Sequence, residues 1–422
     1  MLTDSDTTHD QTRGLGNYLA LWRNRDYLLL WSGQGVSSLG SQASLLALPL
    51  LILAVTGSPA QAGLLGALRG LAYVLFGLPA GAFVDRWNRK AVMILCDVGR
   101  ALAFASIPLV LLLGRLSALQ LYAVSAIEGT LFLFFGLAEA AALTRVVPRS
   151  QLADAVSQNQ VTESVATLLG PALGGVLFGL GRALPFVADA VSYFASALSL
   201  GAIRARFQEE RTVERRALAG EIGEGVRWLW GQPVVRLLMF LNAGVNLLYG
   251  GWTLLLIELA RHRGASPAAI GLVFSLGGAG TIAGALLTPL AQRRFTVGQL
   301  MVVIAWIFAI TWPPYALAPT VLWLGLANAL SFLFVPIFSS TQFSYRLALI
   351  PDALQGRVNS VFRLGTFGGQ TLGFLVTGLL LEWYGPIGTV WITFVPALGL
   401  ALLTTLSAPL RQAGPMAEVA RG

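Results

Sequence analysis

Long apolar runs follow one another along almost the whole chain. A helix needs roughly 20 mostly apolar residues to cross the hydrocarbon core of a bilayer. Of the 422 residues, 55% are apolar and 11% are charged, which excludes an ordinary water-soluble globule. We therefore expect an all-α membrane protein with twelve transmembrane helices, at 28–54, 60–84, 91–113, 117–143, 159–181, 184–203, 235–258, 268–291, 297–317, 320–346, 358–381 and 387–408.

The basic residues are distributed unevenly between the two sides of such a membrane protein. An even number of spans puts both termini on one side, and the segments on that side hold most of the arginines and the single lysine, Lys90. The segments on the opposite side hold only Arg115, Arg182, Arg261 and Arg263. The positive-inside rule therefore predicts that both termini are cytoplasmic. This asymmetry accounts for the net charge of +8, so we expect no nucleic-acid partner.

The chain contains an internal repeat. A shift of 203 residues superimposes six residues of like kind: Gly81 on Gly284, Lys90 on Arg293, Pro148 on Pro351, Ser157 on Ser360, Gly170 on Gly373 and Gly175 on Gly378. Six matches at a single shift indicate two repeats of six spans each. We expect a cytoplasmic tail (1–26), a six-helix bundle (27–203), a cytoplasmic linker (204–233), a second six-helix bundle (234–408) and a second tail (409–422).

The linker is the one long charged segment. Within it, apolar residues recur at helical spacing, at Leu218, Ile222, Val226 and Leu229. This pattern predicts an amphipathic helix that lies on the membrane surface. A helix packed on the cytoplasmic loops would show the same pattern.

Several kinds of chemistry have no residues to support them. The single cysteine, Cys96, lies inside an apolar run, and the two histidines, His9 and His262, have no metal-ligand pattern around them. Lys90 is not preceded by a glycine-rich phosphate loop. We expect no metal, no cofactor and no enzymatic activity, and an ion gradient as the energy source for any uphill work.

The turn between the second and third runs has a distinctive composition. It carries Gly81, Asp85, Arg86, Arg89 and Lys90, and Asp85 ends a helix where the helix dipole disfavours an anion. The turn resembles the loop between helices 2 and 3 of the major facilitator superfamily, a family of solute transporters. The resemblance implies that these residues form a latch that favours one of two access states. An ordinary positive-inside turn is the alternative.

The fifth run contains a proline among glycines. Pro171 removes a backbone donor and bends the helix, and the small residues beside it admit another helix closely. Gly280 and Gly284 give the eighth run a matching small face. The segment is similar to the antiporter motif of drug exporters in the same superfamily, and a purely structural kink is the alternative; its residues are Gly170, Pro171, Gly174 and Gly175.

Ionisable residues inside the bilayer are costly enough to suggest function. We single out seven of them, which all lie in the first half: Arg69, Asp97, Arg100, Glu128, Glu139, Glu163 and Asp189. Glu128 and Arg69 lie at a similar depth, so they could pair. The pair could be a proton-coupling site that responds when rocking separates or wets it. It could equally be a static salt bridge between spans 2 and 4.

The other proton-coupling candidates also have structural explanations. Asp97 and Arg100 lie three residues apart on one helical face, where they could neutralise each other. Asp189 opens the sixth span and resembles an acid found there in related exporters. Its carboxylate could carry a proton or pack against loop amides.

Polar and aromatic residues form stripes along three spans. Lipid-facing positions would not hold amides, so the stripes should face an interior. We expect a roomy, mostly apolar cavity with few polar anchors, suited to a bulky amphiphile and poorly suited to a sugar. Hydrogen bonding between helices could also explain the stripes, which comprise Gln34, Ser38 and Ser41, then Glu128, Phe132, Phe135 and Glu139, and lastly Asn242, Asn246 and Tyr249.

Three further segments resemble the bacterial branch of the superfamily that includes macrolide and enterobactin exporters: Ser32–Gly40, Asp97–Arg100 and Asp189–Ser192. The resemblance implies a monomeric, proton-coupled antiporter of the bacterial inner membrane. Such a protein would export hydrophobic or amphiphilic small molecules by alternating access. A lipid or lysophospholipid flippase, or a non-transporting receptor or assembly protein, could use the same fold.

Overall fold

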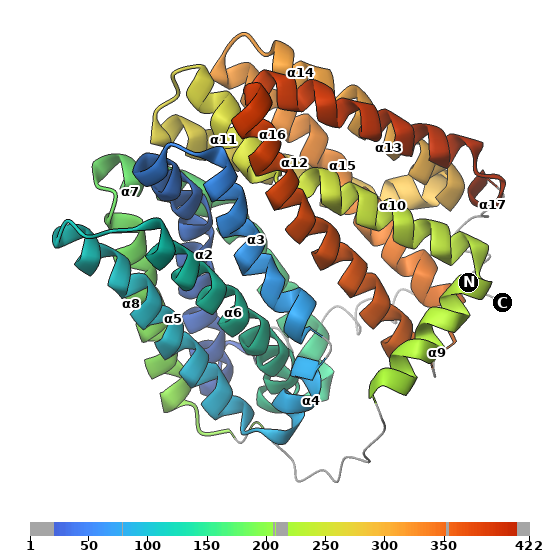
Figure 1. Ribbon diagram of the computed structural model, residues 1–422. Helices are drawn as coiled ribbons and strands as arrows, with labels where there is room; N and C mark the ends of the chain where they lie inside the picture. The colour runs from blue at the N-terminus through green and yellow to red at the C-terminus, as the bar shows by residue number, and fades with distance from the viewer. Residues whose placement is uncertain (1–20, 78, 206, 208–217, 352–353, 412–422) are drawn as a thin grey trace, which may run out of the picture.

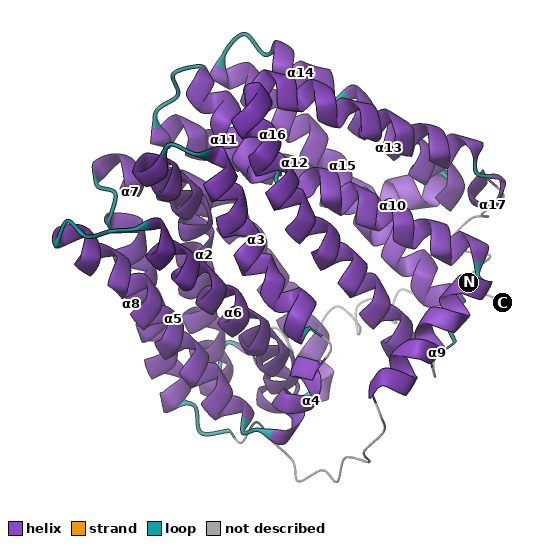
Figure 2. Ribbon diagram, viewed as in Figure 1, coloured by secondary structure: helices purple, strands orange, loops and turns teal. Residues whose placement is uncertain are grey.

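Every regular element that the structure describes is a helix (Figure 2). The structure is a computed structural model, and it describes residues 21–77, 79–205, 207, 218–351 and 354–411, among which no strand occurs. Backbone N–H and C=O groups find no partners in lipid, and a helix satisfies them within itself. The all-α fold class expected from the apolar runs is confirmed.

The first half of the chain forms one bundle (Figure 1). Several of its helices start after a polar residue whose side chain accepts a first-turn backbone N–H, as Asn24, Ser58, Asn88 and Ser117 do. These caps place the helix starts beside the polar ends of the apolar runs. The helices are α2 (Arg25–Thr56), α3 (Pro59–Phe76), α4 (Pro79–Arg86), α5 (Arg89–Leu112), α6 (Ala118–Val146), α7 (Leu152–Leu180) and α8 (Leu184–Ala202).

The second half forms a second bundle, preceded by a helix in the linker. Ser266, Thr296 and Thr320 cap three of its helices in the same way. The linker helix is α9 (Leu218–Gly231). The bundle consists of α10 (Pro233–Gly250), α11 (Trp252–His262), α12 (Pro267–Arg294), α13 (Val297–Ile310), α14 (Trp312–Leu317), α15 (Val321–Leu349), α16 (Gln355–Leu406) and α17 (Ala408–Arg411).

The helices provide twelve spans. In the described ranges, ten helical segments are long and apolar enough to cross a membrane, with α10 joined to α11 and α13 joined to α14. One of the ten, α16, has 52 residues and holds two spans, which meet at Gly385 with φ 67° and ψ 177°. Glycine adopts a positive φ without strain. The remaining span is α3, which packs between α6 and α16.

The two bundles meet at one end of the molecule and diverge toward the other (Figure 1). α3 packs along α16, and α7 packs along α12. One apolar core at the closed end combines both halves, with Leu50 and Leu65 from the first and Leu255 and Leu381 from the second. Toward the other end each bundle has an apolar core of its own. The space between the bundles therefore opens at the end where the cores are separate.

Glycines allow the helices to approach to backbone contact. A side chain at Gly280 or Gly284 would collide with backbone atoms of α15. The small faces of spans 5 and 8, expected to match, do not meet each other, because Gly170 and Gly174 pack on α2 instead. The contact between α7 and α12 uses Gly271, against Pro171, and other glycines of the two helices. Each of these helices thus has one small face for its own bundle and another for the partner bundle.

The backbone contact at Gly284 predicts a stability effect. In Gly284→Ala, the new Cβ overlaps the carbonyl group of Leu333, so α12 and α15 must separate. Overpacking of this kind costs about 1–3 kcal/mol. We expect a lower midpoint of thermal unfolding in detergent. Gly399→Ala in α16 is the matched control, because nothing lies within 4 Å of its Cβ position; an equal loss in both variants would contradict the packing account.

Candidate transport cavity and buried charge cluster

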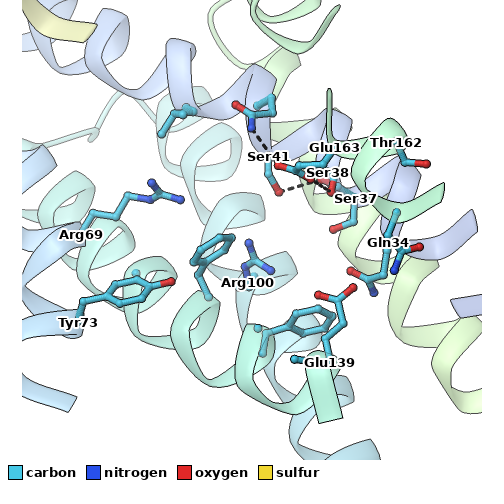
Figure 3. A pocket seen from close by; sticks show the side chains of 18 of the residues that line it. Gln34, Ser37, Ser38, Ser41, Arg69, Tyr73, Arg100, Glu139, Thr162 and Glu163 are labelled. Carbon is cyan, nitrogen blue, oxygen red and sulfur yellow. Dashed lines mark hydrogen bonds between the residues drawn. The ribbon is translucent and has the colours of Figure 1, made fainter. Parts of the chain in front are cut away.

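A cavity of about 630 Å³ lies between the bundles (Figure 3). Its walls come from α2, α3, α5, α6 and α7 of the first bundle and from α16 of the second. It extends from Gly66 and Phe374, near the middle of the helices, to Trp31, Leu143 and Val156, near the open end. Solute can therefore reach the middle of the molecule from one end only.

A carboxylate from the second bundle closes the opposite end. Glu382 of α16 accepts hydrogen bonds from the Ser58 hydroxyl at 2.8 Å and from the Ala60 N–H at 3.2 Å. Both donors belong to the start of α3, where unpaired N–H groups and the helix dipole favour an anion. One turn further along the same two helices, Gly63 lies against Gly378, and between α7 and α12 Gly175 lies against Pro267. These contacts hold the two halves together.

A cluster of buried charges forms part of the cavity wall. Glu128 of α6 binds Arg69 of α3 through two hydrogen bonds, at 2.5 Å from Nε and 3.2 Å from Nη2. Its Oε1 also accepts from Arg100 of α5 at 3.4 Å, and Arg100 lies 3.8 Å from Asp97. The Arg69 side chain is 32% exposed, while those of Glu128 and Arg100 are 4% and 3% exposed. Only Arg69 is open to water in the cavity.

Aromatic rings surround the two guanidinium groups. Phe132 lies 5.3 Å from each of them, and Tyr193 lies 4.1 Å from that of Arg100. Cations over ring faces are stabilised by the ring quadrupole. Tyr73, one turn beyond Arg69, stacks on Phe367 of the second bundle with ring centres 3.9 Å apart. The rings of both halves thus meet at the cavity wall.

Most of the expected stripe residues of the first half line this cavity, namely Gln34, Ser38, Ser41, Phe132, Phe135 and Glu139. The expected residues of the second half do not line it. Asn242 donates to Thr366 at 2.6 Å, and Asn246 donates to the carbonyl of Asn242. Tyr249 packs among aromatic rings, including those of Phe308 and Trp312. Their polar character therefore reflects packing inside the second bundle.

Two further acids lie behind the cavity wall. Asp189 of α8 is completely buried, and its carboxylate accepts from Ser192 at 3.3 Å. It packs against Gly40, where a side chain would come within 2.6 Å of the carboxylate oxygen. Asp97 is equally buried beside Arg100. Neither lines the large cavity.

The basic turn after α4 binds the end of α8. Lys90 donates to the carbonyl groups of Ile203 at 2.6 Å and Gly201 at 3.2 Å, and Arg89 donates to that of Phe207 at 3.3 Å. Cations stabilise the carbonyl groups at a helix C-terminus. The two bonds of Lys90 lie within the first bundle, and the bond of Arg89 reaches the start of the linker. The side chain of Asp85 lies outside the described part of the structure.

Sequence reasoning missed the residues that the second half contributes. Phe367, Gln370 and Phe374 of α16 line the cavity, and Glu382 forms the contact at the closed end. Aromatic and amide residues in an apolar run do not reveal which face they occupy. Glu382 could have been identified from the sequence, because an acid at the outer end of a span can accept hydrogen bonds from the first N–H groups of a neighbouring helix.

Twelve membrane spans in two bundles, with a cavity between them that one end closes, define a solute transporter. Residues 30–362 match the sequence profile of the Major Facilitator Superfamily, and the chain belongs to this family. Its members transport solutes across membranes and are not enzymes.

Relatives and a solved structure cover nearly the whole chain. The uncharacterised MFS-type transporter YfiS of Bacillus subtilis (strain 168) is 28% identical over 86% of this chain and 89% of its own. The multidrug efflux pump Tap of Mycolicibacterium fortuitum is 26% identical over 88% and 93%, respectively. The crystal structure of the nucleoside transporter NupG superimposes with a TM-score of 0.76 at 12% identity, covering 90% of this chain and 98% of that one.

The charge cluster predicts a strong stability effect. Glu128→Gln leaves Arg69 and Arg100 without the carboxylate that they share. Breaking a buried pair costs about 3–5 kcal/mol, and the lower end applies because Arg69 is partly open to water. We expect a marked drop in the unfolding midpoint in detergent.

A double variant and a control test the same interaction. Adding Arg69→Gln to Glu128→Gln should cost less than the sum of the single changes, because the two residues act on each other. Glu163→Gln, which removes a cavity carboxylate bonded to the neutral donors Ser38 and Gln42, should change the midpoint little. Additive effects would mean that Arg69 and Glu128 do not stabilise each other.

The contact of Glu382 predicts a shift in conformation. Glu382→Gln weakens the cap on α3 by about 1 kcal/mol, which changes the ratio of closed to open molecules roughly fivefold. Spin labels at the exposed positions Val55 and Ile387, one in each half, should then show an added long-distance population in pulsed electron resonance. Glu258→Gln is the control, since Glu258 pairs with Arg261 of its own helix. Identical distance distributions in Glu382→Gln and in the unaltered protein would show that Glu382 does not stabilise the closed end.

Proposed function

We propose that this transporter exports hydrophobic or amphiphilic small molecules in exchange for protons, by alternating access. The observation that carries the proposal is a cavity closed at one end whose apolar and aromatic wall contains a buried cluster of ionisable residues. A bulky amphiphile finds apolar surface there, and the charges offer a place where proton binding can be linked to movement.

The lining of the cavity supports this substrate class. Rings of Trp31, Tyr73, Phe132, Phe367 and Phe374 face it, and hydroxyl and amide groups lie between them, as an amphiphile with polar groups requires. The relative named as a multidrug efflux pump supports the same substrate class.

The positions of the arginines support export from the cytoplasm. Arg86 and Arg149 lie at the open end, as do Arg293 and Arg294. At the closed end the described basic side chains include Arg115, Arg182 and Arg261. The positive-inside rule then makes the open end cytoplasmic, together with both termini. In this state the single chain, acting as a monomer, takes up solute from the cytoplasm of a bacterium.

Glu128 is the candidate that links protons to transport. Protonation of its carboxylate weakens its bonds to Arg69 and Arg100, which leaves Arg69 without an ionised partner and Arg100 with Asp97 alone. A proton that moves with the membrane potential supplies about 2.3 kcal/mol per 100 mV, enough for more than tenfold accumulation of solute. Asp97 and Asp189, buried close to Arg100, are secondary candidates.

Two motifs supply the moving parts in this proposal. Pro171 and the glycines around it touch both α2 and α12, so this segment can transmit movement between the halves. The turn that carries Gly81, Asp85 and Arg86 acts as a latch when the cytoplasmic end closes. Helix α9, tied to the start of α16 by an ion pair between Glu224 and Arg357, connects the two bundles.

Transport into liposomes tests the proposal. Purified protein is reconstituted with an acidic lumen, and uptake of a panel of amphiphilic antibiotics is followed. We expect at least one compound to accumulate tenfold or more and a protonophore to abolish its accumulation. Glu128→Gln should reduce gradient-driven accumulation to near the passive level, whereas Glu258→Gln, at the closed end, should not change it.

Two results would contradict the proposal. One is that no compound responds to the pH difference while the folded protein is present in the vesicles. The other is that fluorescent lysophospholipid moves across the membrane and the antibiotics do not, which would identify a flippase.

A further inference from the structure

The charges around the cavity do not balance. Arg69 and Arg100, which line it, are matched by Glu128 and Asp97. Glu139 and Glu163 also line it, and each adds a carboxylate. The cavity wall formed by the first bundle therefore has an excess of negative charge.

Neither of these two carboxylates is neutralised by a cation. Glu163 accepts hydrogen bonds from the neutral groups of Ser38 at 3.0 Å and Gln42 at 3.4 Å. In the part of the chain that the structure describes, the carboxylate of Glu139 forms no hydrogen bond and no ion pair. Glu139 is repelled by Glu163 and by Asp97, and only Arg100, already bound to Glu128, attracts it.

The surroundings of the two acids come from three helices and form a concave wall. Glu139 lies on α6, Glu163 on α7, and Gln34 and Ser38 on α2 (Figure 3). The indole N–H of Trp31 donates to Thr162 at 2.9 Å, which holds an aromatic ring next to the position of Glu163. A carboxylate with an aromatic ring beside it attracts an organic cation through both charge and the ring face.

The second bundle does not cancel this charge. Its residues on the cavity wall are Phe367, Gln370 and Phe374, which are neutral. Its Arg363 lines a separate, small pocket beside Tyr73 and Phe367. The cavity thus has an acidic side on the first bundle and a neutral, mostly aromatic side on the second.

We propose that the substrates of this cavity are lipophilic cations, and that Glu139 and Glu163 select them over neutral molecules of the same shape. The ammonium or phosphonium centre lies between the two carboxylates, and its apolar groups lie against the rings of α3, α6 and α16. This inference rests on the proposed export function, because it assigns the charge of the solute that the same cavity carries.

Equilibrium binding in detergent separates this inference from the transport proposal. The probes are radiolabelled tetraphenylphosphonium, a cation, and unlabelled tetraphenylsilane, a neutral molecule with the same four phenyl groups, as its competitor. At pH 8, where carboxyl groups open to water are ionised, we expect the cation to bind at least tenfold more tightly. In Glu139→Gln and Glu163→Gln the affinity for the cation should fall about tenfold, while that for the neutral probe should stay within twofold.

Two further variants serve as controls for the binding test. Glu139→Asp retains the charge and should retain most of the preference, so a loss caused by disturbed packing would be recognised. Glu258→Gln, at the closed end, should bind both probes as the unaltered protein does. Equal affinities for the two probes in the unaltered protein, or a preference that survives Glu139→Gln combined with Glu163→Gln, would overturn the inference.

The two proposals can fail separately. Cation-selective binding without pH-driven transport would refute proton coupling and leave the assignment of substrate charge intact. Gradient-driven transport of neutral compounds, with no preference for the cation in binding, would refute the assignment and leave the exporter intact.

Discussion

Contact between helix backbones at glycine residues holds the two halves of this protein together. Lipid offers helices no hydrophobic drive to associate, so close packing has to supply the attraction. Gly63 against Gly378 and Gly271 against Pro171 bring the halves into contact at one end. At the other end each bundle closes on its own apolar core. The position of the cavity, and the depth at which Arg69 and Glu128 meet water, follow from that arrangement.

Much of the fold could be predicted because lipid leaves few alternatives. Each apolar run became a span, since a lipid-facing backbone must be helical. Local breaks were not predicted: α10 gives way to α11 at Gly251, and α13 to α14 at Thr311. Such breaks depend on one residue and its neighbours in space, and they leave the hydropathy of the run unchanged. The division of α16 into two spans was predicted, and it falls at Gly385, where the backbone is not helical.

Contacts in the site were predictable where they depend only on the depth of two side chains in the membrane. Counting residues along two helices was enough to suggest that Arg69 meets Glu128, because helical rise is constant. The reach of Arg100 to the same carboxylate depends on how α5 lies beside α6, and the sequence contains no measure of that. Asn242 and Asn246 were assigned to the cavity by their polarity, yet their amides bond Thr366 and the backbone within the second bundle. A polar stripe shows that a face is interior without showing what it faces.

The last two spans are separate helical segments that meet at a kink, because the backbone of Gly385 leaves the helical conformation. The segment before the kink bears Phe374 and Glu382, and α16 packs along α3 of the other bundle. Glycine adopts the positive φ of this kink without strain. The aromatic side of the cavity can therefore tilt at Gly385 while the segment that ends at Leu406 keeps its place in the second bundle.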